Sequence, residues 1–225
     1  MSPRGGTRRK AVKKPVVVVA GEDRNDRQSL RALLEAICPH MSGRIVEISD
    51  DVRLRQATGS RLSQRVKTLA GKIKARAQRE NTEVACVFVH EDLDGVDSEN
   101  YLAVHEKVER ELHAHLGSAH YVLAVAEMEA WLLLFPHALR SVVSTWQVPV
   151  RFRGKDTGKI ADPKKVLMQD VPKKGGRRYS ESDAPKVFSV IANEEDLGSP
   201  MGSNRSWNRF CEDAEQCGQR HVPAD

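Results

Sequence analysis

The chain has 225 residues, of which 40% are hydrophobic and 30% are charged, and its formal net charge is +5. A chain of this length can bury a hydrophobic core without metal ions or disulfides to hold it together. Its longest apolar runs are far shorter than the roughly 20 residues that a membrane-spanning helix needs, and no apolar signal-peptide core follows the first basic residues. We therefore expect a cytoplasmic protein that does not contact a membrane.

The positive charge is concentrated in two segments. Residues 1–14 contain six Lys or Arg and no acid, and residues 151–178 contain ten basic and three acidic side chains. Such segments suit a polyanionic partner, because Lys and Arg release counterions when they contact phosphates; the alternative is that they are merely solvated. We predict that the second segment binds nucleic acid through Lys155, Lys159, Lys164, Lys165, Lys173, Lys174, Arg177 and Arg178.

Strands and helices alternate along the first two thirds of the chain. Val16, Val17, Val18 and Val19 form a β-branched run without polar alternation, which is typical of a strand buried on both faces. Further strands are predicted over 44–48, 84–89 and 119–125, and helices over 30–37, 62–73, 98–112 and 127–135. Strands separated by helices need crossover connections, so we predict an α/β fold with an open, mainly parallel sheet that helices cover on both faces.

Three parts are predicted along the chain. Residues 1–14 form a basic disordered arm, residues 15–148 form the α/β domain, and residues 149–225 form a basic C-terminal helical extension packed on that domain. The last boundary rests on a change of composition, because Gly, Lys and Pro become frequent beyond Pro149.

Several familiar motifs are absent from the sequence. Neither a phosphate-binding loop motif nor a dinucleotide-binding glycine motif is present, and Cys211, Cys217 and His221 lack zinc-finger spacing. The cysteines also lack the paired spacing of a disulfide framework. We therefore expect four reduced thiols at Cys38, Cys86, Cys211 and Cys217.

Acidic residues follow three of the predicted strands. They are Glu22 and Asp23 after the first strand, Asp92 and Asp94 after the third, and Glu127 and Glu129 after the fourth. The carboxyl ends of parallel strands meet at one edge of the sheet, where carboxylates repel one another unless a cation neutralises them. Carboxylate oxygens suit Mg²⁺ or Mn²⁺, so a metal site is the leading hypothesis. The alternative is that these acids only cap the helices that follow.

This pattern resembles a known family. A Glu after the first strand, an Asp-x-Asp after a later strand and this order of strands and helices are similar to the Toprim domain of topoisomerases, bacterial primases and OLD-type nucleases. The runs 127–133, 162–165 and 206–210 resemble its RloB-like branch. Members of that branch are small bacterial proteins of unknown function that often occur beside ABC-type ATPases.

The resemblance implies a function and roles for the acids. It implies that Glu22 serves in acid/base or metal roles, and that Asp92 and Asp94 bind metal. Glu127 and Glu129 match the acidic pair of the RloB-like branch, and the resemblance adds Glu22 and Glu127 to the metal ligands. The implied protein is a Mg²⁺- or Mn²⁺-dependent nuclease that cleaves DNA or RNA in bacterial defence against phage or foreign DNA. Its implied partners are nucleic acid and an ABC-type ATPase. The alternative is a non-catalytic nucleic-acid-binding or ATPase-partner protein with the same fold.

Overall fold

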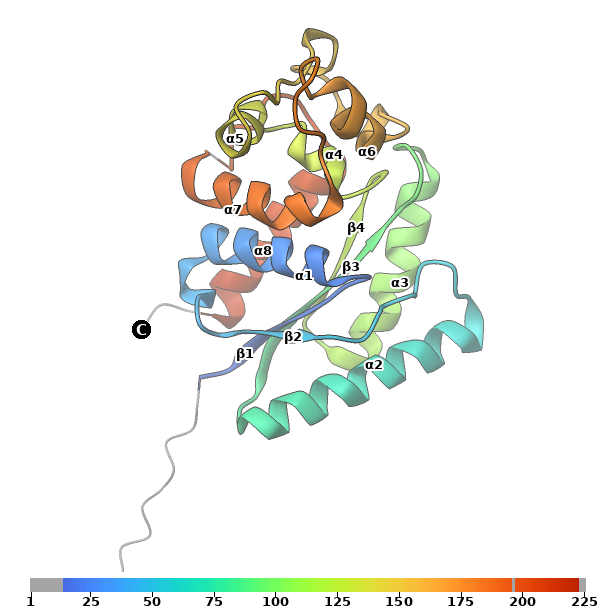
Figure 1. Cartoon of the computed structure of the whole chain (residues 1–225). Coiled ribbons are helices and arrows are strands. Elements are labelled where there is room, and N and C mark those ends of the chain that lie inside the picture. The colour runs from blue at the N-terminus through green and yellow to red at the C-terminus, as the bar shows by residue number, and fades with distance from the viewer. Residues whose placement is uncertain (1–13, 196, 223–225) are drawn as a thin grey trace, which may run out of the picture.

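A computed structural model describes residues 14–195 and 197–222, which contain a four-stranded sheet (Figure 1). Its strands are β1 (Val16–Ala20), β2 (Ile45–Ile48), β3 (Val84–Asp92) and β4 (Ala119–Ala124). They lie in the order β2-β1-β3-β4, and every neighbouring pair is parallel. The prediction of an α/β fold with a parallel sheet is therefore confirmed.

Helices lie on both faces of this sheet. Three of them connect successive strands: α1 (Arg24–Ile37), α2 (Gly59–Glu80) and α3 (Asn100–Leu116). One hydrophobic core lies between the sheet and α1, and a second lies between the sheet, α2 and α3. β1 contributes to both cores, which explains why its residues are apolar without alternation. None of the helices in the described ranges is long and apolar enough to cross a membrane.

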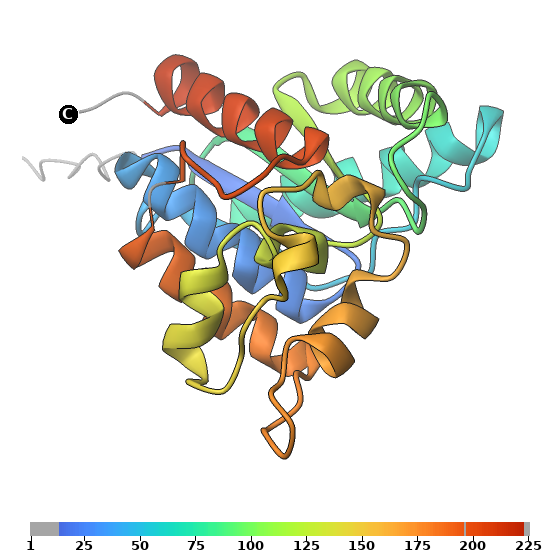
Figure 2. The ribbon, with the colours of Figure 1, turned by 90° about the horizontal axis from the view of Figure 1, so that it is seen from above.

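The C-terminal part of the chain completes the layer on the α1 side. α8 (Arg205–His221) packs beside α1 and directly against β3 and β4, and α7 (Ala184–Glu194) packs on the outer side of α1 (Figures 1 and 2). Trp207 of α8 lies in the core with its ring centroid 5.5 Å from that of Trp131. The division of the chain at residue 148 stays a prediction, and the predicted arm lies outside the described residues except for Lys14.

The predicted helix over 127–135 is interrupted in the structure. Only α4 (Glu129–Leu132) is α-helical there, and α5 (Pro136–Val142) begins after a break. The physical reason is Pro136, which has no N–H to donate and disfavours helical backbone at the residue before it. Beyond these helices, α6 (Pro163–Lys165) and a π-helical turn over Val166–Asp170 lead toward α7.

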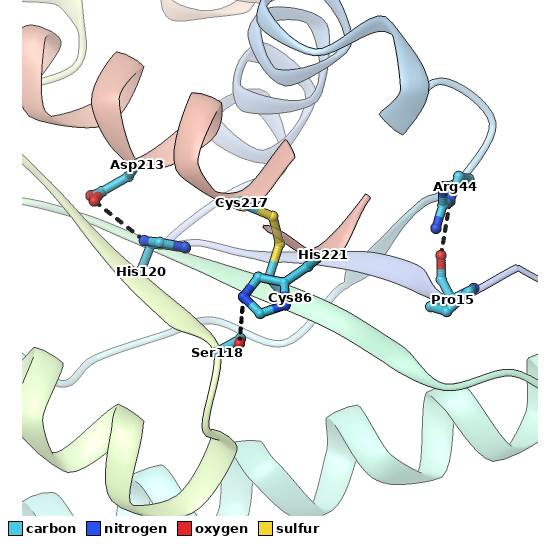
Figure 3. Close-up of a disulfide and its surroundings, with 8 residues drawn as sticks. All are labelled: Pro15, Arg44, Cys86, Ser118, His120, Asp213, Cys217 and His221. Carbon is cyan, nitrogen blue, oxygen red and sulfur yellow. Dashed lines mark hydrogen bonds and ion pairs between the residues drawn. A yellow bond between two sulfur atoms is a disulfide. The ribbon is translucent and has the colours of Figure 1, made fainter. Parts of the chain in front are cut away.

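Cys86 of β3 and Cys217 of α8 form a disulfide, so the expectation of four reduced thiols is wrong for these two residues (Figure 3). Their Cα atoms are 6.6 Å apart, although 131 positions separate them in the sequence. The pair results from the packing of α8 across β3, which cysteine spacing does not reveal. Cys38 and Cys211 are free thiols.

Candidate functional site

A cleft of about 610 Å³ opens at the carboxyl ends of the strands. Eight acids of the described residues line it, and three of them come from separate segments: Glu22 after β1, Asp92 at the end of β3, and Glu129 at the start of α4. The other five are Asp23, Asp26, Glu91, Asp94 and Glu181. Five basic side chains also line it, namely Arg53, Arg55, Arg61, Arg65 and Lys164. The cleft therefore combines carboxylates that could hold a cation with guanidinium groups that could hold an anion.

Asp92 is held from two sides. Its Oδ1 accepts a hydrogen bond from the Met128 N–H at 2.9 Å and lies 3.5 Å from Nε2 of the buried His90. The other ring nitrogen of His90, Nδ1, lies 3.5 Å from Asp26 Oδ2. Burial disfavours a charged imidazole, but the two carboxylates together hold the pKa of His90 well above its ordinary value. Asp92 is thus held in the cleft by a backbone N–H and lies beside an imidazole whose raised pKa favours the protonated form.

Glu22 and Glu129 are destabilised as anions. Burial, together with the negative charge of Asp92, raises the pKa of Glu22 to about 7. Burial raises the pKa of Glu129 to about 8, with Lys164 opposing the shift and Asp92 adding to it. Tyr179 donates its hydroxyl to Glu129 Oε1 at 3.3 Å, which suits either charge state of the carboxyl. A cation in the cleft would relieve this repulsion and would favour the ionised forms.

The other two predicted acids are paired with basic side chains. Asp94, which also lines the cleft, forms an ion pair with Arg55. Glu127 is not part of the cleft lining, and its Oε1 lies 3.5 Å from Lys164 Nζ while its Oε2 accepts from the Lys164 N–H at 3.4 Å. Burial nevertheless raises the pKa of Glu127. The structure therefore gathers Glu22, Asp92 and Glu129 and places Asp94 and Glu127 at their edges.

The acids of the cleft suit a metal ion in their chemistry but not in their present spacing. Within residues 14–195 and 197–222, no three His, Cys, Asp or Glu side chains stand close enough together to hold one ion. The chemistry of the donors does fit, because carboxylate oxygens are the ligands that Mg²⁺ and Mn²⁺ prefer. Burial is the main cause of the raised pKa values of Glu22 and Glu129, so a bound cation would favour the ionised forms that it needs as ligands. An ion would have to draw the side chains of Glu22, Asp92 and Glu129 together.

Sequence reasoning missed Glu91, which organises the basic part of the cleft. Its buried carboxylate accepts hydrogen bonds from the N–H groups of Leu54 and Arg55 at 2.9–3.1 Å and from the Tyr121 hydroxyl at 3.0 Å. These bonds fasten the loop between β2 and α2 to β3. Side chains alternate along a strand, so Glu91 points away from the face on which Asp92 lies. This alternation is the feature of the sequence that could have distinguished the role of Glu91 from that of Asp92.

The predicted nucleic-acid-binding residues are spread over the C-terminal part of the chain. Lys164 lines the cleft, whereas the other seven do not: Lys155, Lys159, Lys165, Lys173, Lys174, Arg177 and Arg178. Lys159 Nζ donates to the Asp97 carbonyl at 2.9 Å, and Arg177 pairs with Asp183 at 2.5 Å. The arginines that do line the cleft come from the β2–α2 loop and from α2, outside the segment that the charge count singled out.

Comparisons with known proteins found no relative of this chain. No protein-family model, no curated protein and no solved structure matches the chain. The parallel sheet is compatible with a Toprim-like fold, and membership of that family stays a prediction from the residues.

Proposed function

We propose that this protein is a divalent-metal-dependent nuclease that hydrolyses phosphodiester bonds in DNA or RNA. The observation that carries the proposal is the single cleft in which Glu22, Asp92 and Glu129 meet a set of arginines. Carboxylates are suited to hold a hard cation, and arginines are suited to hold phosphates through paired hydrogen bonds. Both kinds of group suit a phosphodiester substrate.

Mg²⁺ or Mn²⁺ is the proposed cofactor, and Glu22, Asp92 and Glu129 would hold it. Once bound, such an ion supplies charge stabilisation at phosphorus and lowers the pKa of a coordinated water. His90 orients Asp92 from behind, through the 3.5 Å contact between Nε2 and Oδ1. Lys164 and Arg55 remain in the cleft as phosphate contacts, because Glu127 and Asp94 hold their side chains there.

The family and the biological role are part of the same proposal. The acids at the strand ends and the parallel sheet support a place in the RloB-like branch of the Toprim proteins. A role in bacterial defence and an ABC-type ATPase partner follow from that resemblance.

A non-catalytic nucleic-acid-binding or ATPase-partner protein is the second candidate. The ion pairs of Asp94 with Arg55 and of Glu127 with Lys164 favour it, because they neutralise part of the negative charge within the protein. In this case the cleft would bind a polyanion without turnover.

The test is incubation of purified protein with plasmid DNA, single-stranded DNA and single-stranded RNA, each with Mg²⁺, Mn²⁺ or EDTA. We expect cleavage that requires the ion and that is abolished by Asp92→Asn and by Glu129→Gln. Glu106→Gln is the matched control, because Glu106 is an exposed acid of α3 outside the cleft. Undiminished cleavage by both cleft variants would refute the site assignment. Binding without cleavage by the wild type would favour the second candidate.

A further inference from the structure

Helix α2 is strongly basic on one flank. Between Gly59 and Glu80 it contains seven Lys or Arg and a single acid. At 3.6 residues per turn, five of the seven fall within about 60° of one another around the helix axis, whereas the other two fall roughly 150° away. We call the five the α2 stripe: Arg61, Arg65, Lys72, Arg76 and Arg79. The two on the far flank are Lys67 and Lys74.

The packing of α2 leaves the side chains of the stripe at the protein surface. The apolar face of α2 is buried against the sheet through Leu62, Val66, Leu69 and Ile73. Arg61 and Arg79, at the two ends of the stripe, are exposed. Lys72 and Arg76 keep 42% and 36% of their side-chain surface exposed even though they form ion pairs with Asp50 and Glu80. The charges of the stripe are therefore available to an external anion.

The stripe leads into the cleft. Arg61 and Arg65 belong to both, and Arg53 and Arg55 of the preceding loop continue the basic lining toward Asp92. Figure 1 shows α2 starting at that loop and running back beneath the sheet. With a rise of about 1.5 Å per residue, the stripe is about 27 Å long from its first to its last residue. Phosphates of one strand lie about 3.4 Å apart along a duplex, so the stripe spans about eight nucleotides.

We infer that the α2 stripe docks the phosphate backbone of nucleic acid and directs the strand into the cleft. This rests on the proposed function and adds where the substrate lies. A row of five cations along about 27 Å, three of them exposed and two half-buried, suits a polymer with regularly spaced phosphates. An anionic membrane is a poorer partner, because membrane-binding helices insert an apolar face and the apolar face of α2 is already buried against the sheet.

The test compares two double variants of α2 that carry the same change in charge. Arg61→Gln with Arg79→Gln removes two cations from the stripe, and Lys67→Gln with Lys74→Gln removes two from the other flank. Gln has nearly the helix propensity of Lys and Arg, so both proteins should fold. Fluorescence anisotropy with a labelled duplex of about 20 base pairs, in EDTA and between about 50 and 200 mM salt, gives the salt dependence of binding. EDTA prevents cleavage during the measurement.

We expect the stripe variant to lower the slope of log affinity against log salt by up to about 2, since each lost phosphate contact removes about 0.9. The control variant should keep the wild-type slope. Equal slopes for the two variants, or no binding by the wild type, would overturn the inference. Stripe-dependent binding to phosphatidylserine vesicles without binding to the duplex would overturn it in favour of a membrane surface.

Cleavage with Mg²⁺ separates this inference from the proposed function. Stripe-dependent binding by a wild type that cleaves nothing would uphold the stripe and refute the nuclease. Ion-dependent cleavage by a wild type whose two variants have equal slopes would uphold the nuclease and refute the stripe.

Discussion

Replacing Glu129 by Gln should stabilise the metal-free protein at neutral pH and should have little effect at acidic pH. The side chain of Glu129 is buried, with the residue 6% exposed, and burial raises its pKa from 4.5 to about 8. Gln has almost the same shape and can still accept the hydrogen bond that the Tyr179 hydroxyl donates. The substitution therefore removes the ionisation and keeps the packing.

The size of the effect follows from the difference in pKa between the two states. Near pH 7 the carboxyl of Glu129 has lost its proton in the unfolded chain but keeps it in the folded protein. A raised pKa for an acid means that its contribution to stability is complete below pH 4.5 and is lost as the pH rises toward 8. Each pH unit in this window costs about 1.4 kcal/mol, so the loss by about pH 7 is about 3 kcal/mol. Glu129→Gln avoids that loss.

Urea unfolding in EDTA, followed by circular dichroism near pH 4.5 and near pH 7, measures this difference. At the higher pH the variant should have a higher urea midpoint of unfolding than the wild type. In thermal melts at that pH its Tm should be about 6–12 °C higher. Glu106→Gln is the control, because an exposed surface substitution should change stability by less than about 0.5 kcal/mol. A variant that gains nothing near pH 7, or that gains equally at both pH values, would refute the reasoning.

Divalent ions, loss of the disulfide and pH should each change a measurable property in a stated direction. Mg²⁺ or Mn²⁺ at about ten times its Kd should add about 1.4 kcal/mol to the free energy of unfolding, and Asp92→Asn should lose this gain in thermal melts; a wild type that melts alike with and without ions would contradict it. Cys217→Ser, which removes the bond to Cys86, should cost about 4 kcal/mol in urea unfolding because that bond closes a long loop; Cys211→Ser, at a free thiol, is the control, and an equal loss there would contradict the prediction. Although burial disfavours its charge, the imidazole of His90 should titrate well above pH 6.5 by NMR. Its stabilising contribution should be complete below pH 6.5 and should be lost as the pH rises from there through the raised pKa. Titration at or below 6.5 would show that the ring is not held by its carboxylates.

The fold could be predicted because its central strand has an unambiguous pattern. An apolar run as regular as Val16–Ala20 must be covered on both faces, and helices of adequate length separate it from the strands on either side of it. The disulfide between Cys86 and Cys217 was not predictable, because it depends on how α8 lies across β3. No local pattern encodes that contact.

The acids of the site were predictable as a group but their individual environments were not. The rule that sites lie at the carboxyl ends of parallel strands brings Glu22 and Asp92 to one cleft. Capping explains their neighbour Asp23, whose Oδ1 accepts from the Asp26 N–H at 2.9 Å. The pairing of Asp94 with Arg55 depends on loop geometry, since Asp94 has a φ of 54° that sequence reasoning did not anticipate.

The end of β3 joins the acidic and basic parts of the cleft through the alternation of its side chains. Asp92 lies on the face covered by α1, where His90 fixes it, and Glu91 lies on the opposite face. The carboxylate of Glu91 accepts hydrogen bonds from backbone N–H groups of the β2–α2 loop and from the Tyr121 hydroxyl, so its oxygens are not available to a cation. Those same bonds hold Arg55 beside the acids, because its backbone N–H is one of the donors. Two adjacent carboxylates of one strand, both in the cleft lining, therefore have different tasks: Asp92 leaves its charge to the cleft, and Glu91 holds in place the loop that supplies the cations.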